Sequence, residues 1–211
     1  MRKSVWSALA CPDDVWYGLT LQKDPRGGAL SAEEERSVIK GATSCALLTA
    51  EHMIHRYGPV SPQELAARLG LKLTRTSEKV SEPFLYLSLY LPAQREIILY
   101  DRSLELIEGF LRQNGLEGLT PPEDVSRAAI YHEIFHAWEE DTPGLYTRSR
   151  MLERKALGLF PVRRALDGAC EVGAAHFSKH MAALSYSPCI YEFYLLLALD
   201  RILIDFLPST R

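Results

Sequence analysis

The chain has 211 residues, 47% of them apolar, and a formal net charge of −3 at pH 7. It is long enough for one domain and apolar enough to bury a full hydrophobic core. Because acidic and basic residues nearly balance, the whole chain is not attracted to nucleic acid or to an anionic membrane, and we expect direct binding to neither.

The cysteines and the chain ends indicate a cytoplasmic protein. The four cysteines are scattered without a CxxC pair, which predicts free thiols in a reducing compartment. Met1 to Cys11 faintly resembles a lipoprotein signal, but its apolar run of about six residues is shorter than a signal-peptide core. The apolar stretch 190–207 is interrupted by charged residues, so we expect no membrane span.

Residues 1–30 contain the helix breakers Pro12, Pro25 and Gly27-Gly28, so we expect an irregular arm that packs on the domain. Its candidate packing residues are Trp6, Trp16 and Tyr17. A capping box at Ser31 and Glu34 then predicts a helix that runs to about Tyr57.

Residues 61–100 predict a short helix and a small three-stranded sheet. Ser61, Pro62 and Glu64 form a second helix start, and the helix ends at Gly70. Alternating apolar residues and turn signals predict strands at 71–76, 83–91 and 96–100.

The second of these strands has leucines on one face and Phe84, Tyr86, Ser88 and Tyr90 on the other. One interpretation is an edge strand beside an active site, which holds a peptide substrate by backbone pairing. The alternative is that Tyr86 and Tyr90 only pack against the N-terminal arm.

Three more helices are expected, at 103–113, from Thr120 to about Asp141, and at about 162–184. A final apolar helix at 190–207 belongs to the core or buries against a second subunit, which leaves a homodimer open. We therefore divide the chain into an arm (1–30), a main domain (31–185) and a C-terminal helix (186–211).

The spacer 145–164 is strongly basic. It carries one acid, Glu153, against six basic residues: Arg148, Arg150, Arg154, Lys155, Arg163 and Arg164. Such a run is usually a solvated face, and the sharper alternative is a patch that docks a partner or a phosphate backbone.

The helix that begins at Thr120 contains the motif HExxH, with His132, Glu133 and His136. Histidines four apart share one helix face and can bind one metal ion, while the intervening glutamate suits a general base. From Ala129 to Trp138 no other residue carries charge near neutral pH, as expected of a buried metal-ligand helix. The alternative is a buried helix with two hydrogen-bonded histidines.

A catalytic zinc needs a third protein ligand. Glu139, Glu140 and Asp141 follow the motif directly, but Glu171 is the better candidate because it stands on a helical stripe of small residues that would let two helices approach closely. His176 and His180 project away from Glu171 and are interpreted as surface or packing residues.

The motif, followed by Glu171-x-x-Ala174-x-x-Phe177, resembles the ImmA/IrrE family of metallopeptidases. Tyr57-Gly58 and the helix that ends at Gly70-Leu71 also fit, so the resemblance covers about residues 45–183. It implies an α+β, mostly helical, zincin-like domain with a small three-stranded sheet packed against the HExxH helix. It also implies a regulatory protease that cleaves a separate helix-turn-helix repressor.

The leading hypothesis is a zinc metallopeptidase in which His132, His136 and Glu171 hold the metal and Glu133 is the general base. Manganese would also suit this ligand set. Tyr131 is a candidate oxyanion stabiliser, and Asp167 is a candidate to hold a ligand histidine.

Two rival hypotheses remain. In one, the protein binds a partner and turns over little or nothing, although a pure binder does not need Glu133. In the other, the metal is structural, but such sites usually have four ligands and are often rich in cysteine.

Overall fold

The computed structural model describes residues 2–25, 30–78, 86–149, 151–156, 160–200 and 208. The helices greatly outnumber the strands, which confirms the α+β, mostly helical class with a three-stranded sheet. The elements in chain order are α1 (Arg2–Leu9), α2 (Asp13–Lys23), α3 (Ala32–Tyr57), α4 (Pro62–Arg68), β1 (Lys72–Thr76), β2 (Ser88–Leu91), β3 (Glu96–Tyr100), α5 (Asp101–Gln113), α6 (Pro122–Asp141), α7 (Tyr146–Ser149), β4 (Met151–Ala156), β5 (Phe160–Ala165), α8 (Asp167–Met181) and α9 (Ile190–Ala198).

The N-terminal arm is helical, so the prediction of an irregular segment was wrong. Pro12 is the N-cap of α2, a position where its missing N–H costs nothing, and two aspartates follow in the first turn. Trp16 and Tyr17 are buried as expected, but Trp6 is 60% exposed. The proline that suggested a loop therefore marks the boundary between two helices.

The predicted helix starts at Ser31 and Ser61 are confirmed. Ser31 and Glu34 form a full capping box at the start of α3. At α4 the Ser61 hydroxyl accepts from the backbone N–H of Glu64, whereas the Glu64 carboxylate accepts from Arg68. At the start of α6, by contrast, the buried Thr120 hydroxyl donates to Tyr194 Oη and Pro121 is the N-cap, so the helix begins after the expected Thr120 and has no side-chain cap.

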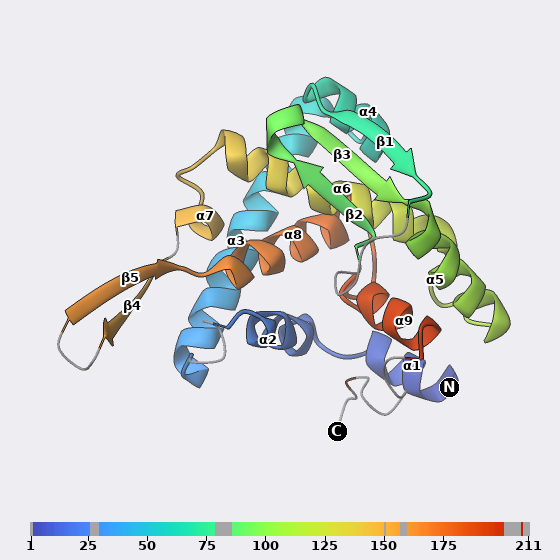
Figure 1. The fold of residues 1–211 in the computed structure, drawn as a ribbon, viewed down its shortest axis with the longest axis horizontal. Helices are drawn as coiled ribbons and strands as arrows, with labels where there is room; N and C mark the ends of the chain where they lie inside the picture. Colours follow the sequence, from blue (N-terminus) through green and yellow to red (C-terminus); the bar gives the residue numbers. More distant parts are fainter. Residues whose placement is uncertain are drawn as a thin grey trace.

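The three-stranded sheet has the order β1-β3-β2, with β1 parallel and β2 antiparallel to β3. Strand β2 therefore lies at an edge. Ser88 and Tyr90 are each 8% exposed and are turned towards α6, which confirms a sheet packed against the motif helix (Figure 1). The start of the predicted strand, with Phe84, lies outside the described residues.

The basic spacer forms α7 and an antiparallel hairpin, β4–β5, which extends away from the body of the molecule (Figure 1). Neither α7 nor the hairpin was predicted from the sequence. Because β5 continues to Ala165, α8 begins at Asp167 rather than at about residue 162.

The arm, the main domain and the C-terminal helix share one hydrophobic core. Helix α9 buries Ile190, Tyr191, Tyr194 and Leu195 within this chain, mainly against α5. Residues 201–207 of the predicted final helix lie outside the described residues. In the described part of the chain, no helix is long and apolar enough to cross a membrane.

Candidate metal centre

His132 and His136 lie on α6 with their Nε2 atoms 3.1 Å apart. The i,i+4 spacing puts both rings on one face of the helix, as the motif predicted. Both side chains are partly buried, at 27% and 21% exposed. The two nitrogens thus converge at the surface of a cleft.

Glu171 reaches the same point from α8. Its carboxylate oxygens lie 3.3 Å from His132 Nε2 and 3.6 Å from His136 Nε2. The close approach of the two helices depends on Gly173, because a Cβ there would lie 2.8 Å from Thr147 and 2.9 Å from the Phe135 ring. Gly173 was not part of the small-residue stripe considered in the sequence.

The three side chains lie close enough together to share a metal ion. Neighbouring ligands of a tetrahedral zinc ion with bonds of 2.0–2.1 Å lie about 3.3 Å apart. The two Nε2 atoms are near that spacing at 3.1 Å, and with one ligand atom from each residue the three atoms lie within 4.8 Å of one another. Among the described residues these three side chains form a group able to hold a metal ion.

Glu139 is a second feature that suits a bound metal ion. Its side chain is 1% exposed, and Oε2 lies 3.0 Å from His136 Nδ1, so the ring can donate there and keep its Nε2 lone pair for a metal. Its Oε1 is buried and has no hydrogen-bond partner among the described residues. Burying a carboxylate in this way is costly unless positive charge is near, and a cation bound to His136 would provide it.

Glu139 therefore holds a ligand histidine, His136, which is the role that the sequence suggested for Asp167. Asp167 is the first residue of α8, and its backbone carbonyl accepts from the Cys170 thiol. A role for Asp167 beside His132 stays a prediction.

The carboxylates make the cluster attractive to a cation. Burial lowers the pKa of His136, but Glu171, the hydrogen bond to Glu139 and the nearby Glu133 outweigh it and raise the pKa to about 9. Burial raises the pKa of Glu171, but His136 and His132 outweigh it and lower the pKa to about 2. A metal ion would thus meet an ionised carboxylate and would replace a proton on the imidazole.

Glu133 is 6% exposed and is held by the edge strand. The Ser88 hydroxyl donates to Oε1 and the Tyr90 backbone N–H donates to Oε2, each over 2.8 Å. The sequence placed Glu133 at the site but did not link it to β2, because these partners are more than forty residues away along the chain.

Tyr131 does not face the site, so the suggestion that it stabilises an oxyanion was wrong. It is 2% exposed, its hydroxyl donates to the Val60 carbonyl, and its ring packs edge-on against Phe177. One residue before His132, it points about 100° away from that side chain around the axis of α6.

Cys170 does not join the ligand group. Burial, followed by Glu139 and Glu171, raises the pKa of its thiol to about 12, and the thiol donates to the Asp167 carbonyl. A four-ligand structural zinc site that includes this cysteine is therefore disfavoured.

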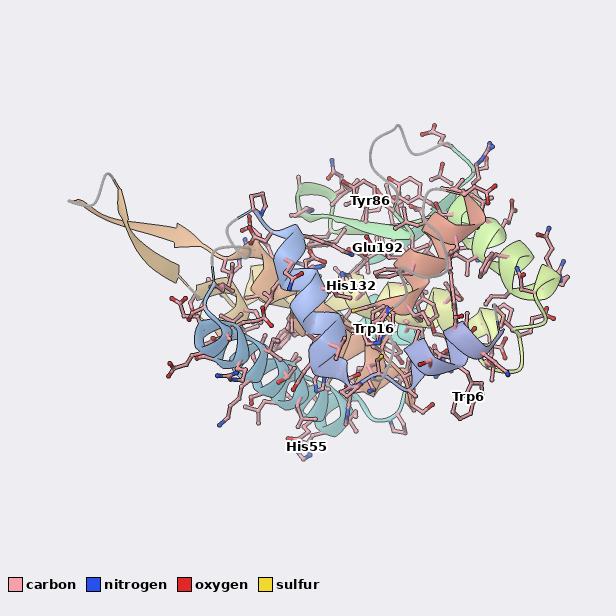
Figure 2. The ribbon with its side chains drawn as sticks, turned by 90° about the horizontal axis from the view of Figure 1, so that it is seen from below. Trp6, Trp16, His55, Tyr86, His132 and Glu192 are labelled. Carbon is pink, nitrogen blue, oxygen red and sulfur yellow. The ribbon has the colours of Figure 1, made fainter. Side chains whose placement is uncertain are left out.

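The three ligands open into a cavity of about 510 Å³. Residues of β2, α6, α8 and α9 line it, together with Thr20 of α2. Figure 2 shows Tyr86, Glu192 and His132 near the middle of one face, whereas Trp6 and His55 project at its periphery. The cluster of His132, His136 and Glu171 is therefore accessible from this cavity.

No protein-family model matches the chain, and no curated protein or solved structure resembles it significantly.

Proposed function

We propose that this protein is a zinc-dependent metallopeptidase. The observation that best supports the proposal is the convergence of His132, His136 and Glu171, with one ligand atom of each within 4.8 Å of the others, on the wall of a cleft that also contains Glu133. A ligand set with two histidines and one carboxylate leaves one position open, as catalytic zinc sites do.

When bound, zinc would polarise a peptide carbonyl and lower the pKa of a water molecule towards about 7. Glu133 faces the same cavity, where it can accept the proton of the attacking water and pass it to the departing amine. Its hydrogen bonds from Ser88 and Tyr90 orient the carboxylate for this exchange. Glu139 orients His136 through Nδ1.

The outer edge of β2, which has no strand partner among the described residues, supports a peptide as the substrate. Residues 86–90 line the cavity beside the ligand cluster, and an extended peptide can add to such an edge by backbone hydrogen bonds. The resemblance to ImmA/IrrE proteases makes an exposed segment of a helix-turn-helix repressor the first protein substrate to test.

Metal analysis is the first experiment. Purified wild-type protein should contain about one zinc ion per chain, and Glu171→Ala should lose it. A wild-type protein that refuses both added zinc and added manganese would refute the proposal.

Glu133→Gln separates a peptidase from a partner-binding module. The variant should keep its zinc and lose peptide cleavage, because only the proton acceptor is removed. If Glu133→Gln retained the full function of the wild type in the cell, the hypothesis of a partner-binding protein without turnover would be favoured.

A further inference from the structure

The cleft along α6 has two chemically different ends. It extends from Ala128 to Glu140 past the ligand cluster, about 18 Å along the helix axis at 1.5 Å per residue. Beyond His136 the lining side chains include Glu139, Glu140 and Arg148, and the last two form an ion pair. Before His132 the lining residues of α6 are Ala128 and Ala129.

Small and neutral residues from other elements complete the end at Ala128. Helices α6 and α8 run antiparallel, since Glu171 meets His136 whereas Ala182 accepts a hydrogen bond from Arg127 near the start of α6. The α8 residues that follow Glu171 therefore lie at this end. The uncharged residues that line the cavity from outside α6 include Ala175 and Ser178 of α8, Tyr191 of α9, and Thr20 and Cys189, whose side chains lie 3.8 Å apart.

The polar atoms of this neutral end are already bonded within the protein. Ser178 donates to the Ala175 carbonyl, Thr20 donates to the Trp16 carbonyl, and Tyr191 shares a hydrogen bond with Tyr186. Burial raises the pKa of the Cys189 thiol, which keeps it uncharged. The wall consequently offers contact area and few free hydrogen-bonding groups.

Glu192 is the charged residue of α9 that lines the cavity. Its side chain is 49% exposed and forms an ion pair with Lys23. It therefore belongs to the rim of the cleft and already has a cationic partner.

The direction of β2 shows which part of a substrate would meet the neutral end. Ser88 and Tyr90 contact Glu133, and Arg95, further along the chain, pairs with Asp141 at the end of α6. Strand β2 and α6 thus run in the same direction. A peptide that pairs antiparallel with β2, the more stable arrangement, would run opposite to α6. Its residues after the scissile bond would then lie towards Ala128.

We propose that this neutral end is the subsite for the side chain that follows the scissile bond, and that it selects an uncharged apolar side chain such as leucine. The inference rests on the proposed peptidase function, because it requires a bond cleaved at the His132–His136–Glu171 cluster.

Binding of hydroxamates to the zinc-loaded protein, measured by calorimetry, tests the subsite without an activity assay. Acetohydroxamate serves as the probe of the metal alone. Three succinyl hydroxamates add an isobutyl, a carboxymethyl or an aminobutyl side chain at the position of the residue after the scissile bond. The isobutyl compound should bind about 10- to 100-fold more tightly than the carboxymethyl compound, as expected for burial of a leucine side chain.

Two variants test whether the preference for the isobutyl compound arises at the neutral end of the cleft. Ala175→Leu should fill the subsite and remove the advantage of isobutyl while acetohydroxamate binding stays unchanged. Because Ala175 is buried and its variant can misfold, Thr20→Asp at the partly exposed edge is the second test. It should shift the preference from isobutyl to aminobutyl.

The outcomes separate the two proposals. Equal binding of isobutyl and carboxymethyl compounds, or a preference of the wild type for aminobutyl, would overturn the subsite and leave the metal centre intact. Leucine hydroxamate, whose side chain precedes the chelating group, should bind no more tightly than acetohydroxamate. Tighter binding would mean that the substrate runs along the cleft in the opposite direction. If no hydroxamate binds, the cluster offers no open metal position and both proposals fail.

Discussion

Helices α6 and α8 each carry two histidines four residues apart, but the two pairs have different surroundings. On α6, His132 and His136 converge on one point with Glu171, and Glu139 holds the second ring from behind. On α8, His180 is exposed, and His176 Nδ1 lies 3.0 Å from the Tyr17 hydroxyl. Burial lowers the pKa of His176, whereas carboxylates raise that of His136.

The two pairs show that spacing alone does not bring histidines into a group that could hold a metal ion. The i,i+4 repeat guarantees that two imidazoles share a helix face, whichever direction that face looks. What distinguishes the α6 pair is a facing carboxylate on another helix and a buried carboxylate behind one ring. The predictions below test whether these acids, rather than the spacing, decide metal binding.

The largest effect should come from removing a histidine of the α6 pair, and removing a histidine of the α8 pair is the control. His136→Ala should abolish zinc binding, and His180→Ala should leave it at the wild-type level, because only the first belongs to the group that could hold a metal ion. Metal content by mass spectrometry after equilibration with zinc measures this directly. In thermal unfolding, zinc should raise the Tm of the wild type and of His180→Ala but not of His136→Ala.

Replacing acids around the α6 pair should give a graded loss. Glu171→Gln should weaken zinc binding most, since it removes an ionised ligand. Glu139→Gln should weaken it by about 10- to 100-fold, as loss of a partner behind a ligand histidine typically does. Glu140→Gln, which changes an exposed residue paired with Arg148, is the matched control and should have little effect. Competition with a chromogenic chelator gives the affinities, and a stronger effect at Glu140 than at Glu171 would mean that the third ligand is wrongly assigned.

The close contact between the helices can be tested at Gly173. Gly173→Ala should lower the free energy of unfolding by about 1–3 kcal/mol, because the added methyl group meets the Phe135 ring and Thr147. Urea unfolding of the metal-free protein measures this without the contribution of zinc.

Gly109→Ala in α5 is the control for this change, since a Cβ there has no atom within 4 Å. It should be neutral or stabilising by about 0.5–1 kcal/mol. Equal destabilisation by both substitutions would show that Gly173 matters for its backbone and not for the approach of α6.

The smallest effect concerns the structural histidine pair. Tyr17→Phe removes the hydroxyl that bonds to His176 and should cost about 0.5–1.5 kcal/mol of stability, with zinc affinity unchanged. A change in zinc affinity would connect the second pair to the metal centre and would undo the comparison.

The sequence was informative wherever the interaction is local. Helix periodicity alone places His132 and His136 on one face, and Glu171 was expected to approach them from another helix, although the close contact lies at Gly173 and not in the stripe of small residues considered. Glu139 could have been identified as the partner of His136, because residues three apart on a helix are neighbours. It was instead considered only as an alternative ligand.

The interactions that were missed depend on tertiary structure. Nothing near Glu133 in the chain indicates that Ser88 and Tyr90 would bond to it, because register and packing of β2 decide this contact. Tyr131 was misjudged for the related reason that a neighbour in sequence points to a different side of a helix. Pro12 was interpreted as part of a loop, although proline is compatible with a helix start.

The contact between Tyr90 and Glu133 ties the edge strand to the motif helix. The backbone N–H that donates to Glu133 Oε2 belongs to β2, which has a strand partner on one side only among the described residues. A displacement of β2 relative to α6 would therefore move the Glu133 carboxylate as well. The position of this side chain is thus set by a strand more than forty residues away in the sequence, and a substitution in β2 can change it without any change in α6.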